Sequence, residues 1–399
     1  MRRLRGRLPA ELTELQVPLT HQERHSWGWF SPPQSVGVLI IGECILFGTE
    51  LTRERRISLR DYYARQEVMR ELGSEGQEKL RRASVTVIGL GGLGTVASAY
   101  LTMAGVGKIR LVDQDTVETH NLQRQILYSI DDVRKPKVEV AARRLERLNP
   151  QVRLELVPEN VREANADEVI SHCDCVVDGL DNMATRYIVN RACTRNLVPY
   201  VFAGAIGMEG NISVFRPPET PCLECVMPDL DDRYLPTCET RGVLGPTAGS
   251  IAALEATETI KLLAGIQPLL EGKLLICDLR EMDFRTIDIQ TRPSCNVCQL
   301  KQPAPVAEQE RLTWLCGQNT VNVNPARPLR IDLKSVPRRL GKGSKIHLRT
   351  PMAVVFQFDR YEVSLFSHGR MLIKGIDSEQ KALELYGRVM AKVGAKPGR

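Results

Sequence analysis

A glycine-rich turn carries the first chemical signal in this 399-residue chain. The run Gly89-Leu90-Gly91-Gly92-Leu93-Gly94 follows an apolar segment, Ser84 to Ile88, and precedes a segment of helical pattern. Glycines in such a turn let backbone N–H groups approach a phosphate, which the helix N-terminus also favours. Asp113 ends the next apolar segment, 24 residues after Gly89, where a carboxylate can bind ribose hydroxyls. The pattern predicts a nucleotide site, and the alternative is a close-packed turn without a ligand.

The residues that follow Asp113 distinguish between nucleotides. They are Asp115, the run Asn121-Leu122-Gln123-Arg124-Gln125, and Lys137. Two cations and an amide near the ribose carboxylate suit a triphosphate, whose charge must be neutralised before an oxyanion can attack it. A dehydrogenase would instead continue with a catalytic His or a Lys–Tyr pair. The simpler alternative for each cation taken singly is a solvated surface residue.

A second polar pair, Asp181-Asn182, follows the apolar segment Cys175 to Asp178. Open sheets of this type bind ligands beyond the carboxyl ends of their strands. A carboxylate there would hold magnesium on the phosphates. Capping the next helix is the alternative role for this position.

Eleven cysteines in a long chain of ordinary composition do not indicate a disulfide framework. Four of them form two pairs, Cys222-x-x-Cys225 and Cys295-x-x-Cys298, which together suit a tetrahedral zinc site of four thiolates. A redox role for either pair alone is the alternative. Six others are interpreted as core thiols: Cys44, Cys173, Cys175, Cys193, Cys277 and Cys316.

The elements that must position these residues alternate between strands and helices. Unbroken apolar strands in such an alternation predict a mainly parallel α/β sheet, Rossmann-like and doubly wound, with antiparallel strands added at one end. The expected strands are Ser84–Ile88, Lys108–Val112, Arg153–Val157, Cys175–Asp178, two between Pro199 and Phe215, Lys273–Leu279 and Phe284–Gln290. The expected helices are 62–72, 77–82, 95–104, 136–148, 166–171 and 249–263. The tail reads as a small α+β module with strands near 321–324, 330–333, 352–358 and 362–367 and a last helix capped by Asp377 or Ser378.

The expected organisation is an N-terminal extension (1–58), a nucleotide-binding α/β domain (59–300), a linker (301–311) and a small module (312–399). Lys and Arg exceed Asp and Glu by 54 to 48, and the last 99 residues carry 18 basic against 8 acidic side chains. This basic tail points to an acidic partner or surface, and the alternative is a module that only supports an assembly of two chains. No apolar run reaches the roughly 18 residues of a membrane span, so we expect a cytoplasmic protein without a membrane or specific nucleic-acid partner.

Several motifs together resemble one family. They are Tyr63-x-Arg65-Gln66, the glycine loop, Asp113-x-Asp115, Asn121-Leu122-Gln123-Arg124-Gln125, Lys135-Pro136-Lys137-Val138-Glu139, Asp181-Asn182 and Gly207-x-x-Gly210. On the basis of these motifs, residues 61–300 resemble the MoeB/ThiF/ubiquitin-activating superfamily, the ATP-dependent activators of ubiquitin-like proteins. The resemblance implies ATP and Mg²⁺ as cofactors, a structural zinc ion on the four paired cysteines, and a homodimer.

The resemblance also assigns roles to single residues. It implies that Gly92, Asp113, Asn121, Arg124, Lys137 and Asp181 contact ATP and that Asp181 also places Mg²⁺. It implies further that Arg65 reaches the phosphates of the neighbouring protomer; the alternative is a solvated helix residue. The flanking residues Gly89, Gly91, Gly94, Asp115, Gln125 and Asn182 complete the expected nucleotide site.

Cys238 precedes a glycine-bearing helix entry, Gly242-Val243-Leu244-Gly245. In relatives with this pattern the cysteine receives the activated carboxylate, and we expect Arg241 and the helix N-terminus to lower its pKa; the alternative is a buried small side chain. The main hypothesis is adenylation of a ubiquitin-like protein ending in Gly-Gly, then a thioester on Cys238 and transfer to a conjugating enzyme. The alternatives are transfer to a sulfur donor, giving a thiocarboxylate for molybdopterin, thiamin or tRNA thiolation, and a nucleotide-binding scaffold without turnover.

Overall fold

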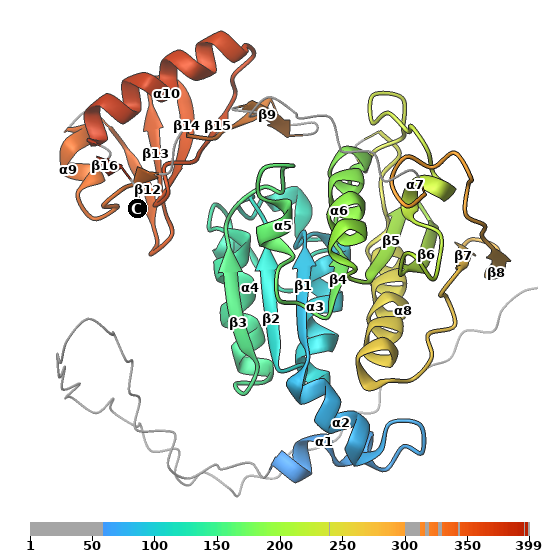
Figure 1. Ribbon diagram of the computed structural model, residues 1–399. Coiled ribbons are helices and arrows are strands. Elements are labelled where there is room, and N and C mark those ends of the chain that lie inside the picture. Colours follow the sequence, from blue (N-terminus) through green and yellow to red (C-terminus); the bar gives the residue numbers. More distant parts are fainter. Residues whose placement is uncertain are drawn as a thin grey trace, which may run out of the picture. The chain divides into compact units, whose positions relative to one another are not determined.

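The computed structural model describes residues 59–238, 240–299, 312–315, 319–325, 329–341, 344–394 and 396–397 (Figure 1). All of them fall in one unit of the chain, Ile57–Arg399. The expected N-terminal extension, the linker 301–311, and the two cysteines Cys44 and Cys316 lie outside the described residues.

An eight-stranded sheet forms the first part, in the order β3-β2-β1-β4-β5-β6-β7-β8. Strands β1 to β5 run parallel, and β6, β7 and β8 are antiparallel to their neighbours. Their bounds are β1 Ser84–Ile88, β2 Lys108–Val112, β3 Arg153–Val157, β4 Cys175–Asp178, β5 Tyr200–Ile206, β6 Glu209–Phe215, β7 Lys273–Asp278 and β8 Asp283–Asp288. The predicted mainly parallel sheet with an antiparallel extension is confirmed.

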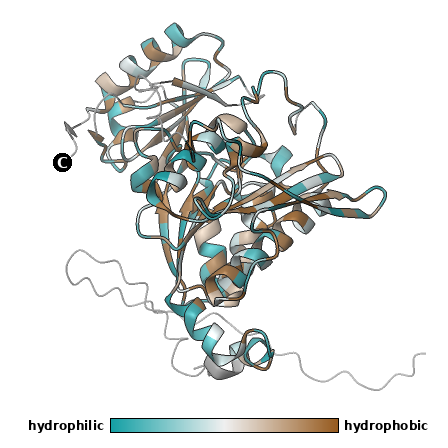
Figure 2. Cartoon of the chain, turned by 45° about the vertical axis from the view of Figure 1, so that its right-hand side comes forward, coloured by the Kyte–Doolittle hydropathy of each residue, from teal (hydrophilic) through white to brown (hydrophobic). Residues whose placement is uncertain are grey.

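Helices cover both faces of this sheet, as Figure 1 shows for α3 and α6. The helices of this part of the chain are α1 Leu59–Glu67, α2 Gly73–Arg82, α3 Gly92–Ala104, α4 Lys137–Leu148, α5 Ala166–Val169, α6 Met183–Asn196, α7 Leu223–Val226 and α8 Gly245–Ala264, of which α1 and α2 lie beyond one end of the sheet (Figure 1). Helix α8 begins four residues before the predicted start, because Pro246 suits a first helical turn, where its missing N–H costs nothing. Figure 2 shows hydrophobic residues gathered on the strands and on the helix faces that pack against them.

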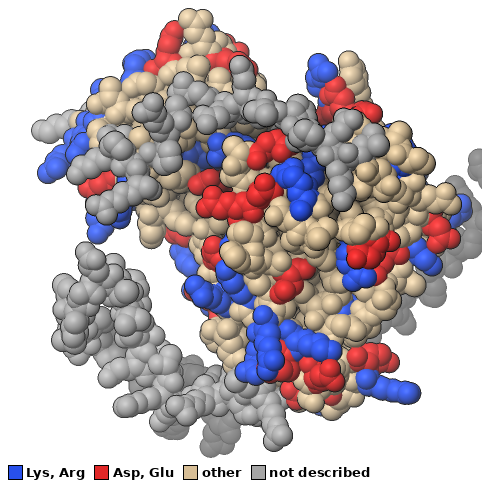
Figure 3. Space-filling model, in the orientation of Figure 1, with Lys and Arg blue, Asp and Glu red and all other residues tan. Residues whose placement is uncertain are grey.

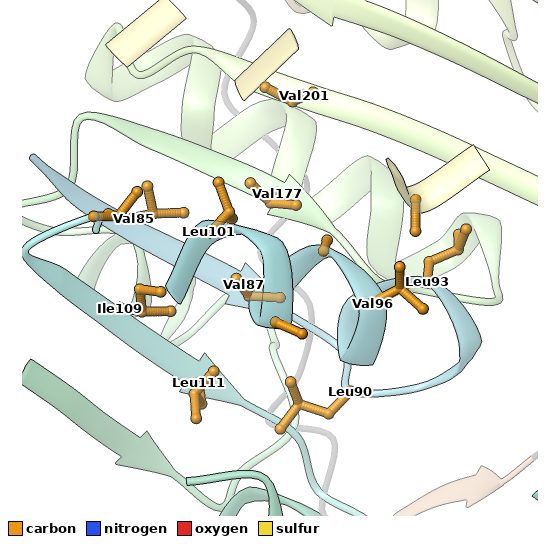
Figure 4. Close-up of a cluster of buried hydrophobic side chains, with 14 of the residues drawn as sticks. Val85, Val87, Leu90, Leu93, Val96, Leu101, Ile109, Leu111, Val177 and Val201 are labelled. Carbon is orange, nitrogen blue, oxygen red and sulfur yellow. The ribbon is translucent and has the colours of Figure 1, made fainter. Parts of the chain in front are cut away.

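The alternation of side chains along β1 separates two cores. Val85 and Val87 point to the face covered by α3, α4 and α8, where Figure 4 shows them beside Ile109 and Leu111 of β2. Ile88 points to the opposite face and packs in the core that α5 and α6 complete. Each of these side chains is at most 2% exposed, and burying one contributes on the order of 1.5–3 kcal/mol. The sheet is therefore held from both sides, and the loops at its ends are fixed to a rigid frame.

The C-terminal module, the described part of residues 312–397, contains a six-stranded antiparallel sheet in the order β12-β13-β14-β15-β10-β9. Its strands are β9 Leu312–Leu315, β10 Thr320–Val323, β12 Ile346–Arg349, β13 Ala353–Phe358, β14 Tyr361–Phe366 and β15 Met371–Lys374; β11 (Leu329–Arg330) pairs with β16 (Lys396–Pro397). Helices α9 (Val336–Leu340) and α10 (Glu379–Val393) complete it, and Ser378 is the N-cap of α10. Figure 3 shows basic side chains along an edge of this module. The sequence pattern did not predict strands β9, β12 and β15. The strand expected near 330–333 was wrong in its bounds, since β11 ends at Arg330 and a turn follows.

Among the described residues, no helix combines the length and the apolar character that a bilayer span requires.

Candidate functional site

The loops after β1 and β4 meet at the point where the strand order reverses, since β2 and β3 lie to one side of β1 and β4 to the other. This is where doubly wound sheets open a crevice for ligands. The two loops touch: a Cβ added to Gly179 would lie 2.0 Å from the carbonyl oxygen of Gly89, and one added to Gly94 would lie 1.8 Å from it. Gly89 also has a φ of +91°, which side chains disfavour. These glycines are thus required for the crevice to form.

Asp113, at the end of β2, closes one side of the crevice. Its carboxylate accepts the backbone N–H of Leu90 in the glycine loop and that of Asp115, each at 2.7 Å. Asp115 in turn pairs with Lys137, Oδ2 to Nζ 3.0 Å, at the start of α4. Lys137 is 5% exposed. Burial lowers its pKa, but the carboxylates of Asp113 and Asp115 raise it by more, so the ammonium group stays charged.

The segment 121–125 lies against the glycine loop. The side chain of Arg124 is near Gly92, and the amide of Gln125 is near Gly91. Arg124 donates to the side-chain oxygen of Asn121 at 3.0 Å, which fixes the guanidinium group. Asn121 and Gln125 are buried, and the Oε1 atom of Gln125 has no hydrogen-bond partner within the described part of the chain. An amide and a cation are therefore presented beside the turn expected to bind phosphate.

Asp181 and Asn182 have different roles in the structure. The side chain of Asn182 accepts the backbone N–H of Thr185 at 2.9 Å and so caps α6. Asp181 is exposed, and its charge raises the pKa of both Lys137 and Cys238. The structure thus brings the Asp181 carboxylate into the electrostatic range of Lys137 and Cys238, at the open side of the crevice.

A buried ion pair under the β4 loop was missed by the sequence analysis. Arg186, in the first turns of α6, donates from Nε to Asp178 at 2.9 Å and from Nη2 to the carbonyl of Leu180 at 2.7 Å. Tyr200 donates its hydroxyl to the same carboxylate. The pair holds the strand end beside Asp181. Its only sequence signal is the spacing from Asn182, because an arginine in a helix usually reads as solvated.

Cys238 lies half-buried in the loop between α7 and α8. The β5–β6 hairpin anchors this loop, since Gly207 donates to the carbonyl of Gly242 at 2.8 Å and accepts from Leu244 at 3.0 Å. The expected lowering of the thiol pKa was wrong. Burial raises the pKa of Cys238, Asp181 raises it further, and Arg124 and Arg186 only partly counteract them. Arg241, the expected cause, pairs instead with Glu209.

Arg65 lies away from this crevice. It is exposed on α1, and its neighbour Gln66 donates to the carbonyl of Ala104, the last residue of α3. The glycine loop is at the other end of that helix, whose 13 residues span about 20 Å. Arg65 is therefore not brought together with Arg124 and Lys137 in its own chain.

The two cysteine pairs do come together. The sulfur atoms of Cys222, Cys225, Cys295 and Cys298 all lie within 4.8 Å of one another. Sγ–Sγ distances of 3.4 to 4.0 Å are close to the about 3.8 Å expected for tetrahedral ligands at a Zn–S distance of about 2.3 Å. The cluster joins the start of α7 to the segment after β8. Of the six cysteines interpreted as core thiols, Cys175, Cys193 and Cys277 are buried, and Cys173 is half-buried.

Comparison with known proteins agrees with this architecture. The sulfur carrier protein adenylyltransferase of Thermus thermophilus is 41% identical over 244 residues, covering 60% of this chain and 90% of that protein. The sulfur carrier protein ThiS adenylyltransferase of Bacillus subtilis is 33% identical over 329 residues, covering 81% of this chain and 97% of that protein. A solved structure of Escherichia coli MccB with ATP is similar at a TM-score of 0.51 and 28% identity, covering 56% of this chain and 69% of that chain.

The family comparison is specific to the first sheet and its helices. The model described as the ThiF family matches residues 63–297, more than half of the chain. This range contains the glycine loop, Asp113, Lys137, Asp181 and all but one of the four clustered cysteines. The alignment with the Bacillus subtilis protein must continue past residue 297, since it covers 81% of the chain. The chain belongs to the ThiF family.

Proposed function

We propose that this chain is an adenylyltransferase that activates the C-terminal glycine of a ubiquitin-like protein with Mg·ATP. The observation that carries the proposal is the convergence, at the switch point of the sheet, of a glycine turn, the Asp113 carboxylate and two fixed cations, Lys137 and Arg124. The names of the relatives, which are adenylyltransferases of sulfur carrier proteins, support the same reaction.

The chemistry needs positioning more than proton transfer. A carboxylate oxygen of the terminal glycine attacks the α-phosphorus of ATP, a C(O)–O–P bond forms, the α–β P–O bond breaks, and pyrophosphate leaves with the bonding electrons. The nucleophile is already ionised, so no general base is needed. Lys137 and Arg124 would hold the phosphates, Asp113 the ribose, and the N–H groups of the glycine loop the α-phosphate region. Asp181 would hold Mg²⁺, which neutralises phosphate charge when bound.

A second copy of the chain is proposed to complete the site. Helices α3 and α8 border an apolar groove of about 480 Å³, lined among others by Val96, Tyr100 and Ile126, and Ile126 directly follows the site residue Gln125. Tyr100 is 47% exposed and Ile126 is 62% exposed, so an isolated chain would leave this apolar surface in contact with water. Arg65 is exposed and distant from its own crevice, so a role on the phosphates would require a second copy of the chain. Pairing across this groove is therefore the arrangement we propose for the homodimer.

The four-thiol cluster is proposed to bind structural zinc. Four cysteines fill a tetrahedral shell, which leaves no open position for a substrate. The backbone N–H of Arg292 donates to Cys225 Sγ at 3.4 Å, as expected for a ligand that carries negative charge. The metal would tie the start of the loop that carries Cys238 to the segment after β8.

Two fates of the adenylate are proposed, and the names of the relatives favour the second. In the first, the Cys238 thiol displaces AMP to form a thioester for a conjugating enzyme. In the second, sulfide-level sulfur from a donor attacks the acyl carbon, AMP leaves with the electrons of the C–O bond, and the carrier becomes a thiocarboxylate. Cys238 is close enough to Asp181 for their charges to interact, so the thioester route would start beside the proposed Mg²⁺ ligand.

Pyrophosphate exchange tests the proposal. The full chain is incubated with ATP, Mg²⁺, labelled pyrophosphate and a ubiquitin-like protein ending in Gly-Gly, and the same carrier without its last two residues is the control. Exchange that requires the Gly-Gly end supports adenylation, and no exchange with any carrier would favour the scaffold alternative. A non-reducing gel of wild type and Cys238→Ala then separates the two fates, since only the thioester route gives a thiol-sensitive adduct.

A further inference from the structure

The C-terminal module contacts the outer side of the turn that carries Asp113 and Asp115. Arg370, between β14 and β15, donates from Nη2 to the backbone carbonyl of Gln114 at 2.6 Å. Its Nη1 donates to Asn322 of β10 at 3.1 Å, and its guanidinium carbon lies 3.7 Å from the ring centroid of Phe366. Only 1% of Arg370 is exposed. Its Nε atom has no hydrogen-bond partner within the described part of the chain, so the bonds from Nη1 and Nη2 and the contact with Phe366 must offset the cost of burial.

Nearby carboxylates, two of them in the nucleotide site, partly offset the effect of burial on the pKa of Arg370, and the charge of Arg162 acts against them. Burial lowers the pKa of Arg370 to about 10, while the carboxylates of Asp115, Glu159 and Asp113 oppose this effect. The guanidinium group is therefore charged at neutral pH. Two of those three carboxylates belong to the turn that faces the expected ribose and phosphates.

Two ion pairs border this contact. Lys374 of β15 lies 2.6 Å from Glu118, and Arg134 lies 2.8 Å from Glu362 of β14. Lys374 also lies 3.8 Å from Glu362, so the four side chains form a continuous row. Beside them is a polar cavity of about 10 Å³, with room for about one water molecule, lined from both parts by residues that include Asp115 and Lys374.

The turn is thus held from two directions. On the inner side, Asp113 accepts the N–H groups of Leu90 and Asp115, and Asp115 pairs with Lys137. On the outer side, the Gln114 carbonyl accepts a charged donor, and such hydrogen bonds are roughly twice as strong as neutral ones. Without the outer bond, Gln114 could rotate and carry both neighbouring carboxylates away from their inner partners.

We infer that Arg370 is a positioning residue through which the C-terminal module preorganises the Asp113–Asp115 turn for nucleotide binding. The inference rests on the proposed function, because ATP is taken as the nucleotide. Coupling between two sites is reciprocal, so Mg·ATP must also stabilise the part of the module that contacts the turn. The module then has a role in the first step of the reaction, whatever partner its basic surface binds.

The test compares Arg370→Met and Arg370→Lys with a control, Arg388→Met, in the full chain. Arg388 pairs with Asp359 inside the module, and its side chain is 58% exposed. Isothermal titration gives the Kd of Mg·ATP without carrier, and pyrophosphate exchange gives the KM values of ATP and carrier. We expect Arg370→Met to weaken ATP binding about tenfold, from the loss of a charged hydrogen bond, with the carrier KM unchanged. Arg370→Lys should recover part of the loss, and Arg388→Met should match wild type.

A second measurement does not depend on the folding of a buried-arginine variant. Hydrogen exchange of the wild type, with and without Mg·ATP, should show slower exchange in β15 (Met371–Lys374) when ATP is bound. Lys374→Met, whose side chain is 25% exposed in the wild type, should reduce that protection and raise the Kd of Mg·ATP about threefold.

The inference is overturned if a folded Arg370→Met protein binds Mg·ATP like wild type, or if ATP leaves exchange in β15 unchanged. A wild type that binds Mg·ATP but exchanges no pyrophosphate with any Gly-Gly carrier would overturn the proposed function instead. In that case the Kd values and the exchange rates in β15 still decide whether Arg370 positions the turn.

Discussion

Replacing Lys137 by Met tests the electrostatics of the site most directly. The substitution keeps an unbranched apolar side chain but removes the cation that pairs with Asp115 at 3.0 Å and offsets the charge of Asp113. Removing one partner of a buried pair typically costs 3–5 kcal/mol. The Asp115 side chain is 34% exposed, so we expect the lower end, about 3 kcal/mol of unfolding free energy. Loss of a preorganised cation should also slow adenylation about 100- to 1,000-fold.

The double variant Lys137→Met/Asp115→Asn distinguishes the effect on stability from the effect on activity. Neutralising Asp115 removes one of the two uncompensated charges, so about half of the lost stability should return. Activity should stay low, because the double variant still offers the phosphates no ammonium group. Thermal unfolding without ligand, where Lys137→Met should lower the midpoint by roughly 5 °C, and pyrophosphate exchange with a Gly-Gly carrier measure the two quantities.

Lys135→Met is the matched control. Lys135 pairs with Asp132 at 3.0 Å two residues before Lys137, and it is not among the residues that line the crevice. It should change stability by about 1 kcal/mol or less and leave exchange unchanged. The reasoning is refuted if Lys137→Met is as stable as wild type, or if the double variant regains activity together with stability.

Three further outcomes are expected. One equivalent of zinc should be measured per chain by elemental analysis, and Cys298→Ser should lose most of it and unfold at a lower temperature. Chains with Arg65→Ala and chains with Lys137→Met, each inactive alone, should recover about a quarter of wild-type pyrophosphate exchange when they are mixed and allowed to re-pair. Half of the dimers are then mixed, and each mixed dimer has one intact site. No recovery would exclude Arg65 acting in trans. Gly94→Ala should abolish ATP binding, because its Cβ would lie 1.8 Å from a loop carbonyl, whereas Gly387→Ala in α10 meets no atom within 4 Å and should stabilise the chain by about 0.5–1 kcal/mol.

The sequence was sufficient to predict strands and the grouping of site residues where local sequence signals and sheet topology agree. Strands β1 to β4 were predicted with the bounds observed, because each segment rich in apolar residues ends next to a residue that favours a turn: Gly89, Asp113, Pro158 and Gly179. The grouping of the glycine loop with Asp113 and Asp181 followed from one rule, that the carboxyl ends of parallel strands lie at the same edge of the sheet. The roles assigned to these residues in binding ATP stay predictions.

The failures concern burial and contacts between distant segments. The pKa of Cys238 was expected to fall because Arg241 is near in sequence, but burial acts in the other direction and Arg241 pairs with Glu209. The bond from Arg370 to Gln114 joins residues 256 positions apart, and no pattern in either segment indicates it. The buried ion pair of Arg186 was not predicted for a related reason, since a buried arginine and a solvated arginine have the same sequence pattern in a helix.

Two cations in the crevice, Lys137 and Arg124, and a third beneath it, Arg186, are fixed before a substrate binds, each by a different partner. Lys137 is held by Asp115, Arg124 by the side-chain oxygen of Asn121, and Arg186 by Asp178. Fixed charges need little reorganisation when phosphate charge shifts during attack, so this arrangement suits a reaction that consists of charge neutralisation and alignment. Arg65 differs, because it is exposed and lies at the far end of α3. If one cation has to be delivered by a second copy, catalysis depends on dimer formation, and the specific activity of the chain should fall on dilution below the dimer Kd while the affinity of each chain for ATP falls much less.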